Sequence, residues 1–523
     1  MNKMTKATIS LMIATILAKV LGFVREMVLA GAYGASMYSD SYIIAMNIPL
    51  VIFAVIGTTL GTVLIPMYFE INNSSGEDSA LEYINNMFNI VIILCIAFGI
   101  LGILFTEHIV KIFAIGFKGD TLKVAIDFTR ITIASIVFTG LSYVMTAYLQ
   151  IKNNFTIPGL ISIPKNIIII TSIILSIKYS PYIMIWGAFL GIISEFLFQV
   201  PFAIKKGYKY KLYINLKDKY IKKTGLLIAP VLIGVAVNQI NTMVDRTLAS
   251  TLVEGSISAL NYANKLNGFV MALITTSIAS VVYPSLSMLF SQNNKKEFTI
   301  SITKIINIVI LLVIPISAGA ISLSQPIVKI LFQRGAFTHE DSMMTSVALI
   351  MYSIGMIAFG LREILGKVFY SLKDTKTPMI NGGIAMIMNV VLNIILVKYF
   401  KVAGLALATS ISAIICIILL FISLKKKIGY FGQDIILKTS FKSLIASSIM
   451  GVMVSLSYNK LSSILDFGSI GEIISLFIAI IIGCLIYGIL IILLRVDEID
   501  NIIINIKDKF YRGNSKIFLR NIN

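Results

Sequence analysis

Charged side chains interrupt long apolar segments of this sequence, and their chemistry limits what the protein can do. Each ionised side chain costs about 2.5–3.5 kcal/mol at the centre of a bilayer, so such residues normally face a protein interior or a water-filled cavity. Basic residues outnumber acidic ones among them. Surplus positive charge in apolar surroundings attracts anions, and phosphate or pyrophosphate suits Arg and Lys donors. The set comprises Lys19, Arg25, Glu26, Lys165, Glu195, Asp245, Arg246, Lys265, Arg362, Glu363 and Lys367, with Asp40 at the start of a segment.

Arg25 and Lys265 are the strongest candidates for binding such an anion. Arg25 precedes Glu26 and aligns with the charged pair at 245–246 under the internal repeat described below. Lys265 lies on a polar helical stripe that includes Asn261, and this stripe has no apolar partner. We therefore predict a cationic cavity, and its candidate ligands are Arg25, Asp40, Arg246, Lys265, Asn261, Glu26 and Lys19.

Other charged residues have structural explanations. Glu363 and Lys367 are four residues apart, so they can neutralise each other on one helix face. Lys19 and Lys165 can extend their ammonium groups towards the membrane surface. Glu195 is interpreted as a structural hydrogen-bond partner.

A second group of polar residues suggests a cation site. One carboxylate with amide and hydroxyl oxygens is a donor set for a small hard cation. Chance placement of Asn in an Asn-rich protein is the alternative explanation. The residues are Asn238, Asn241 and Asp245 on one helix face, with Asn389, Asn393 and Thr409 further along the chain.

Several chemistries are not indicated. The three cysteines, Cys95, Cys416 and Cys484, are far apart inside apolar stretches, which indicates neither disulfides nor a metal motif. The two histidines, His108 and His339, lie in predicted loops. The sequence has no Walker A motif, so ATP is not expected to supply energy. We expect no catalytic residues and no cofactor other than a coupling monovalent cation such as Na⁺.

The elements that position these residues are membrane-spanning helices. The 523 residues are 57% hydrophobic and 13% charged, with a mean hydropathy of +0.91, which excludes a soluble protein. An N-terminal signal peptide is the alternative for the first segment, but its apolar run continues too far, so a retained helix is predicted. Segments long enough to cross a bilayer are 7–31, 41–69, 86–106, 128–150, 157–177, 182–204, 225–250, 257–291, 303–325, 343–372, 378–398, 402–424, 437–458 and 468–494.

Basic residues predict the orientation of these fourteen spans. Lys and Arg in one set of alternate loops outnumber those in the other set by more than two to one, which places both termini in the cytoplasm. The anionic inner leaflet then explains the net charge of +19, and no nucleic-acid partner is needed.

The chain also repeats itself. A shift of 220 residues aligns Tyr42 with Tyr262 and Pro158 with Pro378. Both halves then enter the membrane from the same side, as in rocker-type transporters. The predicted organisation is an N-terminal lobe at 1–210, a C-terminal lobe at 224–424, an added helix pair at 437–494 and a cytoplasmic tail at 495–523.

Four motifs resemble those of the MurJ (MviN) lipid II flippases. The first is Lys19-Val-Leu-Gly-Phe-Val-Arg25-Glu26, followed by Ser39-Asp40-Ser41-Tyr42. The others are Tyr262-Ala263-Asn264-Lys265-Leu266, Phe332-Gln333-Arg334-Gly335-Ala336-Phe337-Thr338 and the segment Phe369 to Pro378. The matches extend over residues 1–400 in the order found in the family.

The resemblance implies the fold of the MOP exporter superfamily: two six-helix lobes in a V around a cationic cavity, with the helices at 437–494 forming a groove for a lipid tail. It implies that lipid II, an undecaprenyl-pyrophosphate-linked peptidoglycan precursor, moves from the inner to the outer leaflet of the bacterial cytoplasmic membrane by alternating access. By position it assigns functional roles to Arg25, Asp40 and Lys265. It also implies a cation site at Asp245, Asn389, Asn393 and Thr409.

This sequence departs from the family in places, and alternatives remain open. Residues 50–60 lack the charges that many relatives carry, and Lys265 replaces a common arginine. A flippase for another polyprenyl-linked oligosaccharide, of capsule or O-antigen type, is the first alternative. A drug exporter of the same superfamily and a membrane enzyme are others. Expected partners are lipid II, membrane lipids and cell-wall synthesis proteins.

Overall fold

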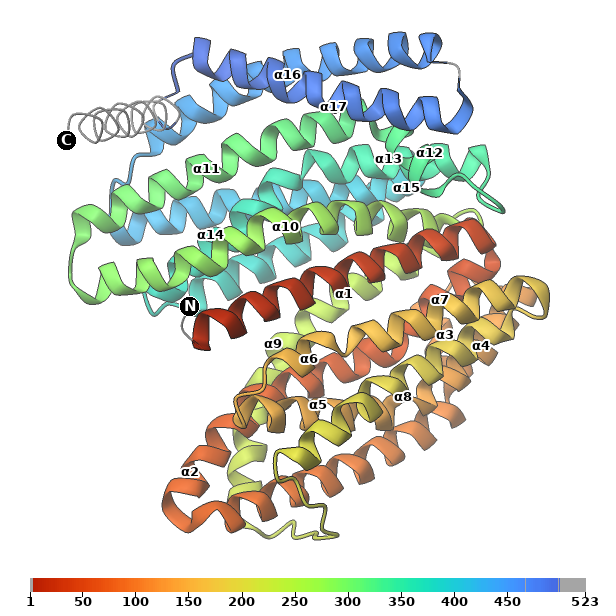
Figure 1. Ribbon diagram of the computed structural model, residues 1–523, viewed down its shortest axis with the longest axis vertical. Coiled ribbons are helices and arrows are strands. Elements are labelled where there is room, and N and C mark those ends of the chain that lie inside the picture. Colours follow the sequence, from red (N-terminus) through yellow and green to blue (C-terminus); the bar gives the residue numbers. More distant parts are fainter. Residues whose placement is uncertain (1–2, 466, 497, 499–523) are drawn as a thin grey trace, which may run out of the picture. The chain divides into compact units, whose positions relative to one another are not determined.

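The computed structural model describes residues 3–465, 467–496 and 498, and for 3–13, 52–59, 229–238, 240, 276, 280 and 281 it describes the backbone only. Within this part the chain forms seventeen α-helices and no strand (Figure 1). The predicted all-α class is confirmed. The helices divide into two compact units, and each unit is described by itself.

Unit 1 comprises Met1–Tyr262, Phe332–Met344 and Asn393–Val402. The long helix α2 is central to it, because α4, α5 and α9 all pack against it, while α7 packs against both α1 and α8. Its helices are α1 (Lys3–Tyr33), α2 (Met37–Leu104), α3 (Thr106–Phe113), α4 (Gly119–Ala134), α5 (Ile136–Ile151), α6 (Thr156–Leu160), α7 (Ser162–Lys178), α8 (Tyr182–Lys205) and α9 (Lys219–Ala249).

Unit 2 comprises Ala263–Leu331, Thr345–Leu392 and Ala403–Asn523. Its largest apolar core forms around α11 and α14, where Ile306, Val309 and Ile364 are fully buried. The remaining helices, some of which contribute residues to both units, are α10 (Ser256–Ser291), α11 (Lys295–Ser322), α12 (Ser324–Phe332), α13 (His339–Ile354), α14 (Met356–Ser371), α15 (Lys376–Ile428), α16 (Gln433–Ile464) and α17 (Gly468–Leu493).

All fourteen predicted spans are helical, and five of them (86–106, 128–150, 157–177, 303–325 and 343–372) run across a break between two consecutive helices. Two pairs of spans follow each other without a loop, because α2 and α15 each consist of two helices that meet at one non-helical residue, Gly76 (φ 86°) and Lys401 (φ 50°). Among the described residues, nine helices are long and apolar enough to cross a membrane, or ten if the bent pair α13–α14 is one span. The division at 210 and 224 stays a prediction, and the compact units place α9 with the N-terminal helices.

The helices repeat with the predicted shift. The pair α4–α5 begins and ends 220 residues before the pair α13–α14. Each pair ends in the same turn, with a positive φ of 57° at Asn153 and at Lys373. In the second turn Asp374 accepts hydrogen bonds from Thr377, and its ion pair with Lys427 helps lower the pKa of Asp374 to about 2.

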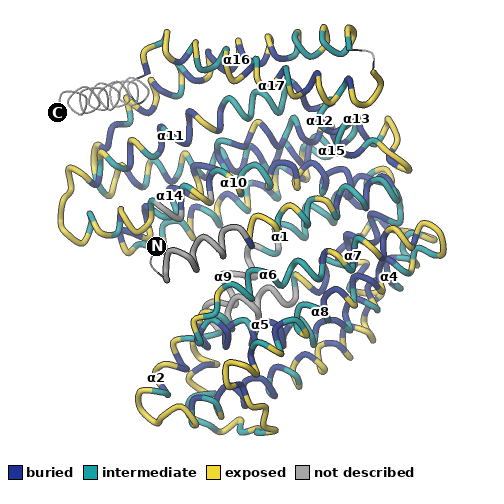
Figure 2. The backbone as a smooth tube through the Cα atoms, viewed as in Figure 1, coloured by how far each residue is buried: buried dark blue, intermediate teal, exposed yellow. Residues whose placement is uncertain are grey.

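The last two helices expose an unusually large apolar surface. Helices α16 and α17 pack side by side (Figure 1), and much of each remains exposed or half-buried (Figure 2). Leu437, Phe441 and Phe477 are among their exposed side chains. A surface of this kind is stable only in lipid, so the chain is a multi-pass membrane protein.

The turn at 333–338, which carries one of the family-like motifs, packs against the end of α1. The backbone N–H of Ala336 donates to the carbonyl of Gly31 at 2.9 Å. A Cβ atom on Gly335 would lie 2.2 Å from that carbonyl oxygen, and Gly335 has a φ of +58°. Only glycine fits this position, because other L-residues both clash and disfavour this backbone region.

The start of α2 holds the start of α10. The carboxylate of Asp40 is buried, and it accepts from the backbone N–H groups of Gly255 and Ser258, each at 2.8 Å. The hydroxyl of Ser258 donates to the same carboxylate at 2.5 Å. Asp40 therefore satisfies N–H groups at the α10 N-terminus that have no partner within the helix, and its negative charge suits the positive end of the helix dipole.

The substitution Gly335→Ala should lower the free energy of unfolding by about 2–4 kcal/mol, because it adds a steric clash to an unfavourable φ. Thermal or denaturant unfolding of the purified protein measures this. The matched control is Gly366→Ala, where no atom lies within 4 Å of the new Cβ. That change should be neutral or stabilising by about 0.5–1 kcal/mol. Equal effects of the two substitutions would contradict the described packing.

The substitution Asp40→Asn should lower the free energy of unfolding by about 1.5–3 kcal/mol, the range for a hydrogen bond to a charged group. An amide has a single oxygen, so its NH₂ group would face a backbone N–H donor. The exposed Asp120, in the first turn of α4, provides the control, and Asp120→Asn should change stability by less than about 0.5 kcal/mol. If Asp40→Asn is as mild as Asp120→Asn, the cap does not stabilise the fold.

Candidate substrate site

Arg25 is the centre of the polar site in unit 1. It lies on α1, and its side chain is 19% exposed. One guanidinium nitrogen donates to Glu26 Oε1 at 2.6 Å, and the other donates to Asn166 Oδ1 on α7 at 3.2 Å. The packing of α1 against α7 brings Asn166 to Arg25. The charge of Arg25 is thus compensated within an apolar helix bundle.

Glu26 and Asn261 complete this arrangement. The second carboxylate oxygen of Glu26 accepts from the side-chain amide of Asn261 on α10 at 3.0 Å. Glu26 therefore joins Arg25 to Asn261. The structure brings together three predicted site residues, and their role in binding an anion stays a prediction.

Arg25 keeps donors for a ligand. A guanidinium carries five N–H donors in a planar fork, and the bonds to Glu26 and Asn166 use two of them. A diphosphate offers several acceptor oxygens, which matches the fork. The site can therefore bind an anion without first losing its resting contacts.

Asn166 was missed by the sequence analysis. It is an uncharged residue in an apolar segment that holds many such residues, so composition does not single it out. Its one signal is its position next to Lys165. It is 4% exposed, and its role depends on a contact 141 residues away in the chain.

A cavity of about 230 Å³ lies in unit 1 beside Lys165 and Glu195. The two residues form an ion pair at 3.2 Å, which agrees with the structural interpretation of Glu195. Hydroxyl groups line much of the remaining wall, and its polar residues are Thr132, Ser135, Thr139, Ser142, Tyr143 and Thr146. Such a lining suits water or hydroxyl-bearing ligands.

The other candidate anion ligands lie elsewhere. Lys19 is half-buried on α1, Arg246 is half-buried on α9, and Asp40 caps α10 as described above. Lys265 is exposed on α10 and belongs to unit 2, whereas Arg25 belongs to unit 1. The role of each as a substrate ligand stays a prediction. Glu363 and Lys367 form the predicted pair, at 3.7 Å.

The predicted cation ligands form two hydrogen-bonded pairs. Within unit 1, the amide of Asn393 donates to Asp245 at 2.5 Å. Within unit 2, the amide of Asn389 donates to the hydroxyl of Thr409 at 3.4 Å. Both asparagines are buried. Of the two remaining residues of this group, Asn241 is half-buried on α9, and Asn238 lies outside the residues whose side chains are described.

These pairs present oxygen donors of the type that binds alkali cations. Each asparagine donates through its NH₂ group, which orients the amide oxygen away from that partner. Among the described residues, no group of three or more His, Cys, Asp or Glu side chains could hold a metal. The donor chemistry therefore fits a hard monovalent cation better than a transition metal.

Comparison with known proteins agrees with this architecture. The family model described as "Lipid II flippase MurJ" matches residues 29–476. The lipid II flippase MurJ of Thermosipho africanus is 30% identical over 436 residues, which are 83% of this chain and 87% of that protein.

Solved structures of MurJ and of related transporters also match this chain. A structure titled "Lipid II flippase MurJ, inward closed conformation" is 31% identical, with a TM-score of 0.78, and the match covers 92% of this chain and 98% of the other. An inward-facing multidrug resistance MATE transporter of the MOP superfamily has a TM-score of 0.66 at 12% identity, which shows a shared fold. The match of the family model over most of the chain, with relatives at 30% identity or more, shows that this chain belongs to the MurJ family of lipid II flippases.

Proposed function

We propose that this protein moves lipid II from the inner to the outer leaflet of the bacterial cytoplasmic membrane by alternating access. The observation that carries the proposal is similarity to MurJ proteins along nearly the whole chain, in both sequence and fold. The arrangement around Arg25 supports it, because a half-buried guanidinium with spare donors suits a pyrophosphate head group.

Arg25 has a defined task in this process. A pyrophosphate that leaves water for apolar surroundings loses its hydration, and that penalty is prohibitive unless its charge is neutralised and hydrogen-bonded. Arg25 supplies both a positive charge and directed donors. Glu26 and Asn166 hold the guanidinium in position, and Asn261 holds Glu26.

The process requires no covalent chemistry. Lipid II is the same molecule before and after transfer, so the chain acts as a transporter and not as an enzyme. Both termini lie in the cytoplasm in this proposal, as the basic loops indicate. The alternative of another polyprenyl-linked oligosaccharide is not supported by the comparisons, since the matching MurJ proteins are named for lipid II.

The test replaces Arg25 in a bacterial strain depleted of its own lipid II flippase. The readout is the fraction of lipid II that an externally added lipid II-cleaving toxin can reach. Arg25→Ala should lower the rate of flipping roughly 10- to 100-fold, which corresponds to the loss of one hydrogen bond to a charged group. The flipping rate of the Arg25→Lys variant should lie between those of the unaltered chain and Arg25→Ala, because lysine keeps the positive charge but lacks the planar fork of N–H donors.

The control is Arg130→Ala, since Arg130 is 54% exposed and pairs with Asp127 at the surface. This variant should flip lipid II as the unaltered chain does. The proposal fails if the unaltered chain does not restore toxin access although it is present in the membrane. A normal rate with Arg25→Ala would remove Arg25 from the mechanism.

We also propose that a monovalent cation such as Na⁺ binds at Asp245 and couples to transport. The carboxylate of Asp245 and the amide of Asn393 are already in contact, and such a pair can supply one charged and one neutral oxygen ligand. A bound cation would balance the charge of Asp245 inside the membrane.

Sodium should therefore stabilise the purified protein. At a concentration 100 times the dissociation constant, a ligand stabilises the folded state by about 2.7 kcal/mol. The melting temperature should rise in NaCl relative to choline chloride at equal ionic strength, and Asp245→Asn should abolish the rise. Asp78→Asn, at an exposed residue, should retain it. An equal rise in all three proteins would show that sodium acts elsewhere.

A further inference from the structure

The segment between α8 and α9, residues 206–218 (the linker), has no helix, yet three asparagines of α2 hold it in place. The amide of Asn85 donates to the carbonyl of Lys209 and accepts from the N–H of Lys211, at 3.0 and 3.1 Å. Asn89 donates to the carbonyls of Lys211 and Tyr213, at 3.0 and 3.1 Å. Asn86 both donates to and accepts from the backbone of residue 215, at 2.9 Å each.

These bonds give the linker the geometry of a β-strand edge. All the backbone groups held by the asparagines belong to the odd-numbered residues 209–215. In an extended chain, alternate residues present their N–H and C=O groups along the same edge. The side-chain amides of α2 thus take the place of a neighbouring strand, and they fix the orientation of the linker.

The even-numbered residues form an exposed apolar row. Leu212 is 78% exposed, Leu216 is 65% exposed and Ile214 is 48% exposed. Tyr210 begins the row and is 54% exposed, with its ring centroid 5.7 Å from that of Phe88 and its hydroxyl donating to Asn89 at 2.9 Å. Because successive side chains of an extended segment alternate between two faces, this row lies on one face. An ordered row of this kind is unfavourable in water.

The linker lies at the level of the membrane surface. On this half of α2 the first strongly exposed apolar residue is Ile93, which is 50% exposed and lies one helical turn, about 6 Å, beyond Asn89. Ile204, 59% exposed, is the last exposed apolar residue of α8 before the linker. The linker is therefore held just outside the part of the protein that faces the acyl chains.

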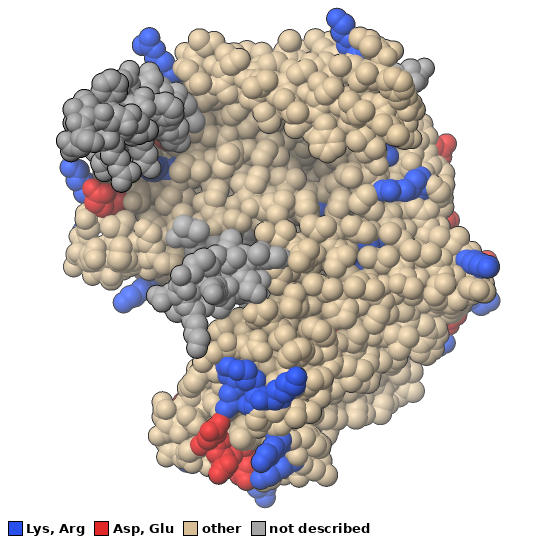
Figure 3. Space-filling model, in the orientation of Figure 1, with Lys and Arg blue, Asp and Glu red and all other residues tan. Residues whose placement is uncertain are grey.

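The linker and its flanks are strongly basic. Between residues 205 and 223 there are eight lysines and one acidic residue, Asp218, whose carboxylate caps the start of α9 by accepting from the N–H of Tyr220. Figure 3 shows basic side chains gathered, with a few acidic ones, at the end of the unit where α2 turns and the linker lies. The side chains of Lys209, Lys211 and Lys217 are exposed.

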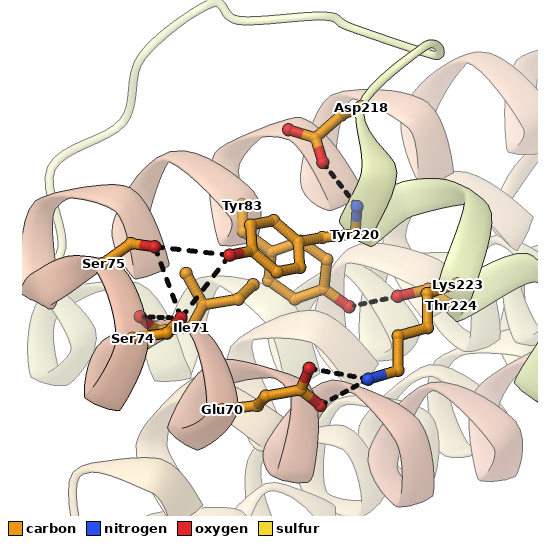
Figure 4. A network of polar contacts seen from close by, with 9 residues as sticks. All are labelled: Glu70, Ile71, Ser74, Ser75, Tyr83, Asp218, Tyr220, Lys223 and Thr224. Atoms are coloured by element: carbon orange, nitrogen blue, oxygen red, sulfur yellow. Dashed lines mark hydrogen bonds and ion pairs between the residues drawn. The ribbon is translucent and has the colours of Figure 1, made fainter.

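Both ends of the linker are fixed to the same helix. Figure 4 shows the start of α9 held against α2, where Lys223 pairs with Glu70 at 2.6 Å and Tyr83 bonds Thr224 at 2.7 Å. Tyr220 reaches the hydroxyl groups of Ser74 and Ser75. The apolar row is consequently presented by a rigid frame.

From this geometry we propose that the linker is a binding surface for the acidic phospholipids of the leaflet it faces. Leu212, Ile214 and Leu216 insert among the outer acyl-chain segments, and Tyr210 lies at the headgroup level. The long stems of Lys209, Lys211 and Lys217 let their ammonium groups reach lipid phosphates beside the strand. The basic-loop bias makes this the inner leaflet. Charge complementarity favours this occupant over an added strand from another protein.

A tryptophan reporter tests the surface in the full-length protein. The chain contains a single tryptophan, Trp186, so Trp186→Phe provides a silent background. Leu212→Trp in this background, in proteoliposomes, should show blue-shifted emission and quenching by lipids brominated on their acyl chains. Leu216→Trp serves as a second reporter if the first variant does not fold. The matched control is Asn73→Trp, an exposed residue at the α2 turn, whose emission should stay that of a residue in water.

The lysines should determine which lipid is found at the reporter. In mixed bilayers, brominated phosphatidylglycerol should quench Leu212→Trp more strongly than brominated phosphatidylcholine, with an enrichment of about fivefold for each lysine that contributes. Replacing Lys209, Lys211 and Lys217 with Gln should bring the ratio close to one. Quenching without any such preference, or tryptophans at 212 and 216 that remain unquenched, would overturn the proposal. The unquenched result would favour a protein strand as the occupant.

Discussion

The cost of placing charge in apolar surroundings governs this protein. In unit 1, Arg25 is matched by Glu26 and by the amide of Asn166, and Lys165 is matched by Glu195. The bond from Arg25 to Asn166 joins α1 to α7, and the ion pair of Lys165 with Glu195 joins α7 to α8, so these polar contacts also help to hold the helices together. The charge of Arg25 is matched, but its planar fork retains hydrogen-bond donors. A site with its charge paired and donors left over is what the proposed transfer of a lipid-linked anion requires.

Polar side chains also hold the helix ends and the connecting segments in place, by forming hydrogen bonds with backbone groups. Asp40 supplies acceptors to the start of α10, and three asparagines of α2 supply both donors and acceptors to a segment that has no neighbouring strand. In each case one short side chain satisfies backbone groups that would otherwise lack partners. Buried backbone groups rarely remain unpaired, because the loss is comparable to that of a hydrogen bond. Polar residues thus define the chain path where apolar packing alone would allow several.

The internal repeat places the same pair of helices, followed by the same turn, twice in the chain. Helices α4–α5 and α13–α14 share their lengths, their spacing and the positive-φ residue that follows them. The charged residues do not repeat in the same way: the position of Arg25 in the first half is occupied by Asp245 in the second. The scaffold is therefore common to both halves, and the chemistry differs between them.

The sequence by itself determined the helical class, the spans, the repeat and the family, because these depend on local composition, on period and on short motifs. It also identified Arg25, Glu26 and Asn261, since a charge or a polar stripe in an apolar segment is conspicuous. Only the tertiary structure decided which groups meet. Asn166 beside Arg25, Asp40 at the start of α10 and the asparagines behind the linker all depend on contacts more than a hundred residues apart. Such contacts leave no signal in the local sequence. An asparagine is the same letter in the sequence whether its side chain faces solvent, another helix or an extended segment.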